Sequence, residues 1–303
     1  MNKQLMDDLE EVGGTLTASN LRGCDEVLIE QPDFSARIAL WGGHLVSFIP
    51  KSGVDVLFQS SNAGGNGRFD GQHMGVPVCW PWFAGNKSQE DYPSHGLVRY
   101  LRWTLAEVSR YKDGDIKIIL KLNSDKHPLI EDMWPQAFEL SLVFRLGDGF
   151  RVDFFAANLS DEAMEISEAL HTYFHVGNSE QIRIEGLDGL SYIDKFADNI
   201  KDEQEGDVDP CTNIDRVYIN PLNKICLFDP VLKRKILVST KGNSNIVLWN
   251  PGMERAKART DMGDLEYKNF VCIEPANALD NSYQLQPGEI HQLRMEVKIE
   301  PIV

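Results

Sequence analysis

The sequence predicts an all-β fold, either a sandwich or a barrel, built from many short antiparallel strands. Short apolar-rich runs recur along the whole chain, and proline, glycine and aspartate residues separate them. Helical periodicity is weak, so we expect short helices only at 3–12 and 261–265. Many short strands with turn residues between them are typical of sandwiches and barrels.

The clearest predicted strands form a hairpin. Residues 138–146 alternate between apolar and polar, the turn Gly147-Asp148-Gly149 follows, and 150–158 begins a second strand. Residues 116–122 alternate in the same way. The other predicted strands lie, in chain order, at 25–30, 35–40, 44–49, 164–167, 181–186, 224–228, 235–240, 245–250 and 292–299.

The length of 303 residues allows one large all-β domain or two ordinary domains. The acidic stretch 198–210 is predicted to be a surface loop rather than a domain boundary, because strand-like spacing resumes on both sides. We therefore expect an N-terminal extension at 1–20 and a single domain at 21–303.

The composition excludes several classes of protein. A net charge of −16 argues against nucleic-acid binding, which needs a basic face. The sequence contains no run of 18 apolar residues of the kind that spans a membrane, and the acidic N-terminus lacks the apolar core of a signal peptide. The five cysteines form no CxxC pair, which is typical of a reduced cytoplasm and gives no metal knuckle. We expect a cytoplasmic protein, a monomer, whose partner is a small molecule.

A rigid, aromatic-rich loop is predicted at 75–83 and 94–99. It contains three aromatic residues and two prolines in its first part, and His95 and Arg99 in its second. Prolines disfavour a central helix or strand here. Flat aromatic walls with a few polar groups are typical of a small-molecule pocket, and a sugar would suit one. The alternative is a structural loop whose aromatics close the end of a core.

Two histidines, His171 and His175, flank an aromatic pair. If the segment is extended, both lie on one face. An i, i+4 histidine pair could instead bind zinc, but the intervening glutamate of that motif is absent and no cysteine cluster supplies further ligands. We expect no metal here. A structural role in the core is the alternative for both residues, and it is favoured for His175.

A single glutamate, Glu274, follows four apolar residues and precedes Pro275, which predicts a carboxylate at the end of a buried strand. Buried glutamates are nearly always paired or functional. Partial burial would raise its pKa towards the range of a general base.

Other familiar catalytic motifs do not occur in the sequence. It has no G-x-S-x-G nucleophile elbow, no G-x-G-x-x-G and no Walker loop. The glycine-rich run 64–67 lacks a following lysine and helix, so it is weak evidence for a phosphate site. The remaining acid and base groups suit proton transfer at a carbonyl or hemiacetal.

Six motifs in order resemble the aldose 1-epimerase (mutarotase) superfamily, and in particular its branch of glucose-6-phosphate 1-epimerases. The resemblance extends from about residue 25 to 297, and it implies a large antiparallel β-sandwich of the galactose-mutarotase type. The motifs are Gly75-Val76-Pro77-Val78-Cys79-Trp80-Pro81-Trp82-Phe83, His95-Gly96-Leu97-Val98-Arg99, Leu170-His171-Thr172-Tyr173-Phe174, Asp215-Arg216-Val217-Tyr218, Trp249-Asn250-Pro251 and Val271-Cys272-Ile273-Glu274-Pro275.

The resemblance implies that the enzyme opens and closes the sugar ring by acid/base catalysis. Glu274 matches the general base that takes the anomeric hydroxyl proton, and His171 matches the general acid that protonates the ring oxygen. His95 matches a histidine that hydrogen-bonds near the reacting oxygens. No cofactor is needed, because the reaction is redox-neutral.

Substrate contacts are also implied: Asp215 matches a sugar-binding aspartate and Arg99 an arginine that reaches a phosphate. The family usually has an arginine before its Gly-Ile/Val-Pro, but His73 stands there in this chain. A histidine near phosphate is a weaker and pH-dependent cation, and Arg68 or Lys87 could compensate for it. The expected substrate is a hexose 6-phosphate. The alternatives are a mutarotase for an unphosphorylated or modified sugar, and a non-catalytic sugar-binding module.

Overall fold

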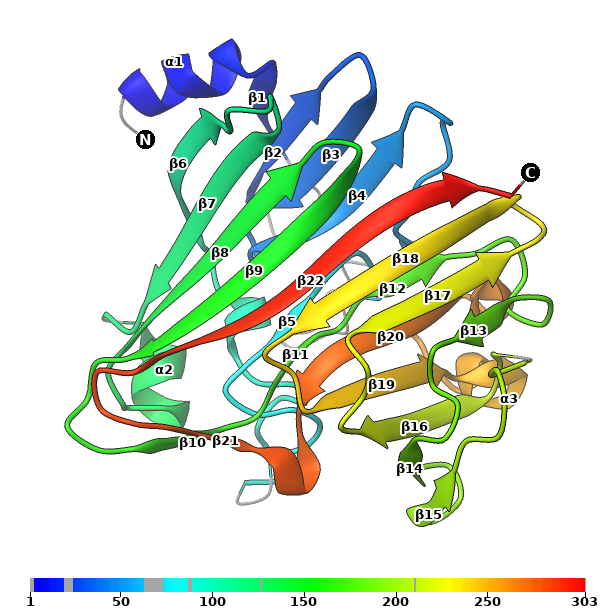
Figure 1. Ribbon diagram of the computed structural model, residues 1–303. Helices are drawn as coiled ribbons and strands as arrows, with labels where there is room; N and C mark the ends of the chain where they lie inside the picture. Colours follow the sequence, from blue (N-terminus) through cyan, green and yellow to red (C-terminus); the bar gives the residue numbers. More distant parts are fainter. Residues whose placement is uncertain are drawn as a thin grey trace.

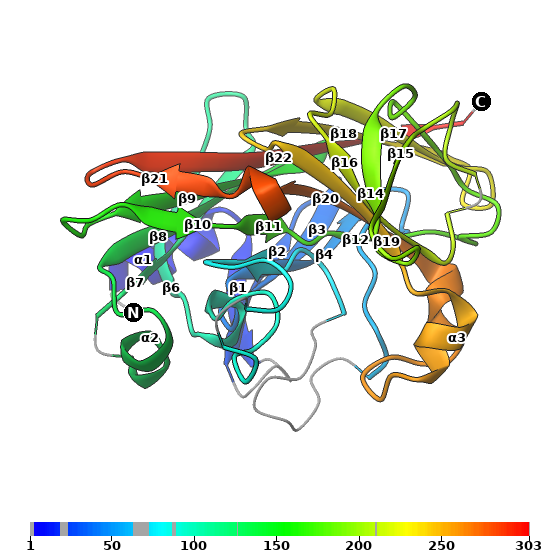
Figure 2. The ribbon, with the colours of Figure 1, turned by 90° about the horizontal axis from the view of Figure 1, so that it is seen from below.

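Two layers of antiparallel β-sheet form most of the protein (Figures 1 and 2). The computed structural model describes residues 3–18, 24–62, 73–86, 89–125, 127–209 and 211–302. An additional small sheet lies beside the two layers at the N-terminal end of the chain. The all-β prediction is confirmed.

The outer layer is an eight-stranded sheet that crosses the front of Figure 1. Residues of its strand β8 alternate strictly between buried and half-buried, so one face covers the core. The predicted hairpin is confirmed, since β8 and β9 pair around residues 147–148. In spatial order the strands are β13 (Arg183–Glu185), β17 (Lys224–Asp229), β18 (Arg234–Lys241), β22 (Ile290–Pro301), β9 (Gly149–Asn158), β8 (Phe138–Leu146), β7 (Ile116–Asn123) and β6 (Thr104–Arg110).

The second layer is another eight-stranded sheet, and its central strand β20 is buried along its whole length. The acidic stretch 198–210 lies at the surface as predicted, but the prediction of a loop is wrong for residues 200–203, which form the exposed edge strand of this sheet. The strands are β15 (Ile200–Glu203), β14 (Ser191–Asp194), β16 (Ile214–Ile219), β19 (Asn245–Asn250), β20 (Phe270–Asn277), β11 (Glu168–Leu170) and β5 (Val78–Cys79), with β12 (Tyr173–His175) also paired to β20.

The small sheet joins the N-terminal residues to the rest of the fold. Helix α1 (Lys3–Glu11) packs through Leu5 and Leu9, so the predicted N-terminal helix is confirmed. The strands are β1 (Gly14–Ala18), β2 (Asp25–Glu30), β3 (Phe34–Ala39) and β4 (His44–Pro50), and a separate pair joins β10 (Met164–Ile166) to β21 (Tyr283–Leu285). The proposed domain boundary at residue 20 stays a prediction.

Short helices connect the strands. The helix predicted at 261–265 is wrong: these residues form bends and turns between α3 (Gly252–Lys257) and the 3₁₀ helix η2 (Glu266–Asn269). A six-residue helix such as α3 or α2 (Pro128–Met133) is too short to show helical periodicity. The other 3₁₀ helices are η1 (Val98–Tyr100) and η3 (Leu279–Asn281). Among the described residues, no helix combines the length and the apolar character needed to span a membrane.

A buried ion pair links the two layers away from any cavity described below. His291 Nε2 on β22 lies 2.8 Å from Glu168 Oε1 on β11, and Asn277 on β20 donates to the same oxygen at 3.0 Å. Tyr283 covers the His291 ring at 4.1 Å. Burial lowers the pKa of His291, but the hydrogen bond and charge of Glu168, helped by the charge of Glu289, outweigh burial and raise it.

This pair predicts a pH-dependent contribution to stability. Because the folded pKa of His291 is raised, the contribution is fully present below its unfolded value of about 6.5 and is lost as pH rises through the folded value. We expect Glu168→Gln to lower the free energy of unfolding more at pH 6 than at pH 8.5, as measured by urea denaturation. An equal loss at both pH values would show that the pair does not titrate with folding.

Candidate active site

A cavity of about 450 Å³ opens over the second sheet and is lined by all six predicted site residues. They come from segments far apart in the chain: His73, His95, Arg99, His171, Asp215 and Glu274. Sheet pairing and loop packing therefore bring together residues that lie up to 201 positions apart in the sequence, from His73 to Glu274. Trp249, Tyr173, Lys195 and Arg259 also line the cavity and were not predicted as site residues.

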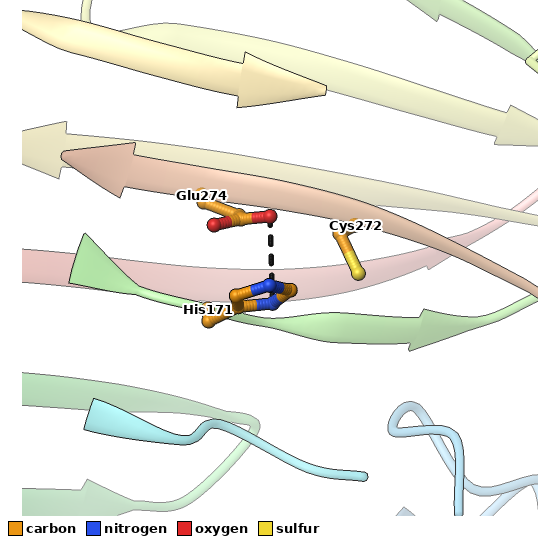
Figure 3. A group of neighbouring side chains, drawn as sticks. All are labelled: His171, Cys272 and Glu274. Carbon is orange, nitrogen blue, oxygen red and sulfur yellow. Dashed lines mark ion pairs between the residues drawn. The ribbon is translucent and has the colours of Figure 1, made fainter. Parts of the chain in front are cut away.

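Glu274 and His171 meet at the point where one edge of β20 passes from pairing with β12 to pairing with β11. Strand β12 pairs with 270–272 of β20 and β11 pairs with 276–277, so residues 170–172 cross opposite Glu274. His171 Nδ1 lies 3.4 Å from Glu274 Oε1 (Figure 3). The same break in pairing accommodates Pro275, which has no N–H to donate. The predicted end of the strand at Glu274 is therefore wrong, because β20 continues to Asn277.

Burial controls the charges of this pair. It raises the pKa of Glu274 well above the usual value; nearby Asp215 adds to the rise and Arg99 opposes it. Burial lowers the pKa of His171 well below 6.5, and the neighbouring His95 and Arg99 lower it further. Both shifts favour the neutral forms, so the pair holds a single proton that either the carboxylate or the imidazole can carry.

Cys272 lies beside this pair (Figure 3). One donor atom from each of His171, Cys272 and Glu274 lies within 4.8 Å of the others, which is close enough for a metal ion. Burial, with the charge of Glu274 as a smaller cause, raises the pKa of the Cys272 thiol well above 9.0. A protonated thiol is a poor ligand, because metals bind the thiolate. A metal here would also occupy both members of the acid/base pair.

His95 is held in one orientation by the loop around it. The Ala84 N–H donates to His95 Nδ1 at 3.3 Å, so the neutral ring carries its proton on Nε2. Its ring lies 5.2 Å from that of His171, edge to face. Burial and the charge of Arg99 lower the pKa of His95, so the imidazole is neutral at pH 7.

The aromatic loop 75–83 serves the core more than the cavity. Trp80 packs against Phe138 at 4.6 Å, and Trp82 donates to the Pro93 carbonyl at 2.8 Å. Only Phe83 of the three aromatics lines the cavity. The expectation that this loop forms an aromatic wall is therefore right for Phe83 and wrong for the two tryptophans, which close the core as in the alternative interpretation.

Arg99, on η1, lines the cavity, and only 4% of its surface is exposed. Burial acts to lower its pKa, but Tyr100 and other neighbours, including Glu274, more than compensate, so the guanidinium stays charged. A buried guanidinium that faces a cavity can bind an anion through two parallel hydrogen bonds.

Asp215 on β16 provides an acceptor on another wall of the cavity. Burial raises its pKa to about 6; Asp194 adds to the rise and Lys195 opposes it. The Lys195 N–H donates to the Asp215 carbonyl at 2.7 Å, which fixes the lysine beside it. An ionised carboxylate here could accept hydrogen bonds from two sugar hydroxyls.

His73 lies in the cavity wall, but both its nitrogens face protein partners. Its Nδ1 lies 2.9 Å from the Tyr173 hydroxyl, and its Nε2 lies 2.9 Å from Asp261 Oδ2. Burial lowers the pKa of His73 in spite of Asp261, so the ring is neutral at pH 7. The two residues that could compensate for it, Arg68 and Lys87, lie outside the described residues, as does the glycine-rich run 64–67.

His175 takes no part in the cavity. Its Nδ1 lies 3.2 Å from the Asp55 carbonyl, and its own carbonyl accepts from Arg234 at 2.7 Å. This placement agrees with the structural role favoured for His175.

Comparison with known proteins agrees with this geometry. The model of the aldose 1-epimerase family matches residues 25–298. An Escherichia coli (strain K12) protein named "Putative glucose-6-phosphate 1-epimerase" is 34% identical over 276 residues, which are 89% of each chain. A protein of the same name from Salmonella typhimurium (strain LT2) is 31% identical over 291 residues, 94% of each chain.

A solved structure shows the same fold. The crystal structure described as "a putative mutarotase (YeaD) from Salmonella typhimurium" matches with a TM-score of 0.85 and 30% identity, over 94% of both chains. This likeness confirms the predicted β-sandwich of the mutarotase type. The chain belongs to the aldose 1-epimerase family, and it is an isomerase.

Proposed function

We propose that the protein interconverts the α and β anomers of a hexose 6-phosphate, with glucose 6-phosphate as the expected substrate. The observation that carries the proposal is the direct contact between Glu274 and His171 in a cavity that also holds the buried cation Arg99. The names of the relatives support the same substrate class.

The contact distance suits the chemistry of a hemiacetal. Ring opening removes a proton from the anomeric hydroxyl and adds one to the ring oxygen, and both oxygens are bonded to the same carbon. An acid and a base that serve them must therefore lie close together, as Glu274 and His171 do at 3.4 Å.

In the proposed cycle the protonation states of Glu274 and His171 are exchanged during ring opening and restored during ring closure. In the opening step Glu274 as carboxylate takes the hydroxyl proton, and His171 as imidazolium protonates the ring oxygen, which breaks the ring C–O bond. The aldehyde then rotates about its first carbon–carbon bond. In the closing step the sugar hydroxyl that was formed from the ring oxygen attacks the carbonyl carbon, and His171 takes the proton of that hydroxyl. Glu274 protonates the carbonyl oxygen. His95 Nε2–H stabilises charge on the reacting oxygens.

A panel of sugars tests this function. Two-dimensional exchange NMR on glucose 6-phosphate, glucose and galactose, with EDTA present, should show faster anomer exchange for the phosphorylated hexose. Unchanged exchange for every sugar would reject the enzyme function. Faster exchange of the free sugars alone would support the alternative mutarotase, and binding without exchange would support a binding module. A rate that fell on adding EDTA would contradict metal-independent catalysis.

The raised pKa of Asp215 predicts a pH effect on binding. Asp215 accepts sugar hydroxyls best when ionised, so we expect KM for glucose to rise as pH falls below about 6. Free glucose is the right probe, because the phosphate of glucose 6-phosphate itself titrates near pH 6. Asp215→Asn should give a KM that is higher at neutral pH and nearly independent of pH from 5 to 8. A pH-dependent KM in that variant would assign the titration to another group.

The state and compartment of the protein are also part of the proposal: a monomer in the cytoplasm. All five cysteines are free thiols, which fits a reducing compartment. Light scattering coupled to size exclusion should give the mass of one chain, 34.2 kDa.

A further inference from the structure

The residue that replaces the family's arginine, His73, has no free N–H for a phosphate. Its Nε2 faces Asp261 and its Nδ1 faces the Tyr173 hydroxyl, both at 2.9 Å. A neutral imidazole has only one N–H, and Asp261 Oδ2 is the acceptor beside Nε2. The cavity therefore needs another donor at this wall if it is to hold a phosphomonoester.

Arg259 lies two residues before Asp261 in the sequence, and Asp261 is the partner of His73 at this wall. It follows α3 and lines the same cavity as His73, His95 and Arg99. Its guanidinium lies 5.5 Å from the centre of the Trp249 ring, and Trp249 is itself stacked beside His73 at 6.2 Å. Among the described residues, Arg259 has no carboxylate within ion-pair distance, although, after the hydrogen bond from His73, its charge contributes to lowering the pKa of Asp261, so its guanidinium remains accessible to a ligand in the cavity.

The loop that carries Arg259 is bonded to the segment around Ser60, which itself donates from its N–H to the His73 carbonyl at 3.0 Å. Glu266 accepts from the Gly263 N–H at 2.9 Å, from the Ser60 hydroxyl at 2.6 Å and from the Ser61 N–H at 2.7 Å. The Arg259 N–H also donates to the Ala256 carbonyl at 3.1 Å. The bonds from Ser60 and Ser61 join residues 206 and 205 positions apart, and together with the two local bonds they hold the loop as a fixed wall.

We propose that Arg259 binds the phosphate of the substrate together with Arg99, in place of the donor that His73 does not supply. The inference depends on the proposed hexose-6-phosphate activity and adds a specificity-determining residue to it. A phosphomonoester carries between one and two negative charges at pH 7, and Asp261 adds a negative charge at this wall. Arg99 alone leaves this wall short of positive charge, whereas Arg99 and Arg259 together supply two cations on one ligand.

The position of Arg259 separates its role from the chemistry. Arg259 is an exposed residue of the cavity lining, whereas Arg99 is buried and its charge acts on Glu274. Loss of Arg259 should therefore weaken binding of the phosphate without changing proton transfer. Loss of such a residue raises KM for the phosphorylated sugar and has little effect on a free sugar.

The test compares Arg259→Gln with the wild type on two substrates. A charge-assisted hydrogen bond contributes about 1.5–3 kcal/mol, which corresponds to a change in affinity of about 10–150-fold. Because Arg259 is exposed, we expect the lower end: KM for glucose 6-phosphate and the inhibition constant of inorganic phosphate should each rise about tenfold. KM for glucose should change far less than KM for glucose 6-phosphate.

Two variants act as controls. Lys257→Gln removes the same charge from an exposed position two residues away that does not line the cavity, and it should leave both KM values unchanged. His73→Arg, which restores the family's arginine, should recover phosphate affinity in the Arg259→Gln background. Recovery would show that the two positions supply one function, and thermal melts would confirm that both variants are folded.

The outcomes separate this inference from the proposed function. If the wild type exchanges glucose 6-phosphate anomers and Arg259→Gln keeps the same KM, the role of Arg259 is wrong and the function stands. If Lys257→Gln has an effect equal to that of Arg259→Gln, the effect is a general one of charge and the assignment also fails. If the wild type does not act on glucose 6-phosphate, the proposed function fails first.

Discussion

Glutamine in place of Glu274 is expected to reduce kcat for anomer exchange by about 10²–10⁴-fold, the usual contribution of a general base. Glutamine has almost the same shape as glutamate but cannot take a proton. Its side chain is 1% exposed and lies within β20, so the variant should keep its fold and its KM. Exchange NMR at substrate concentrations above KM measures the loss, and circular dichroism checks the fold.

A matched control for this variant is Glu26→Gln. Glu26 is also a largely buried strand glutamate, but it lies on β2, pairs with Arg37 at 3.8 Å and does not line the cavity. We expect it to keep full activity. Full activity of Glu274→Gln would remove the general base from the proposed cycle, and the pair with His171 would then be structural.

Alanine in place of Gly96 is expected to cost about 2–5 kcal/mol of stability, from a left-handed backbone and a steric clash together. Gly96 has φ of +77°, and an added Cβ would lie 2.0 Å from the Trp80 carbonyl oxygen. The same oxygen accepts a hydrogen bond from the Leu97 N–H at 3.0 Å, so it cannot move freely. Because Gly96 follows His95, activity should fall together with stability. Urea denaturation measures the first and exchange NMR the second.

Gly53→Ala is the control that separates strain from clash. Gly53 has φ of +81°, but an added Cβ there meets no atom within 4 Å. The difference between the two variants therefore measures the cost of moving Trp80. Equal losses would mean that the contact between residues 80 and 96 relaxes without cost, and that the loop is softer than its packing indicates.

The strands of the outer sheet could be predicted from the sequence because one face of each strand is buried and the other is partly exposed to solvent. In residues 138–146 apolar and polar side chains alternate in the sequence, and buried and half-buried side chains alternate in the structure. The pattern fails where a strand is buried on both faces or is only three residues long, as in β11 and β12. There the register with β20 determines the structure, and register is a property of the paired strands rather than of either sequence alone.

The candidate site was predictable to the extent that its residues stand in unusual local contexts. Glu274 after four apolar residues and His171 beside aromatics both line the cavity, as expected. Arg259 gave no such signal, because an arginine after a short helix is ordinary in a sequence. Its place at the cavity depends on Glu266 and Ser60, which are distant in the chain. The pairing of His73 with Asp261 could not be predicted for the same reason.

The single proton held by Glu274 and His171 has a consequence for the solvent. During ring opening the carboxylate gains a proton and the imidazolium loses one, and ring closure reverses both changes. The pair regains its starting state inside the cavity, so a complete cycle exchanges no proton with the surroundings. Uncatalysed mutarotation is accelerated by any buffer acid or base that can reach the sugar. The enzyme-catalysed rate should instead be independent of buffer concentration at constant pH and ionic strength.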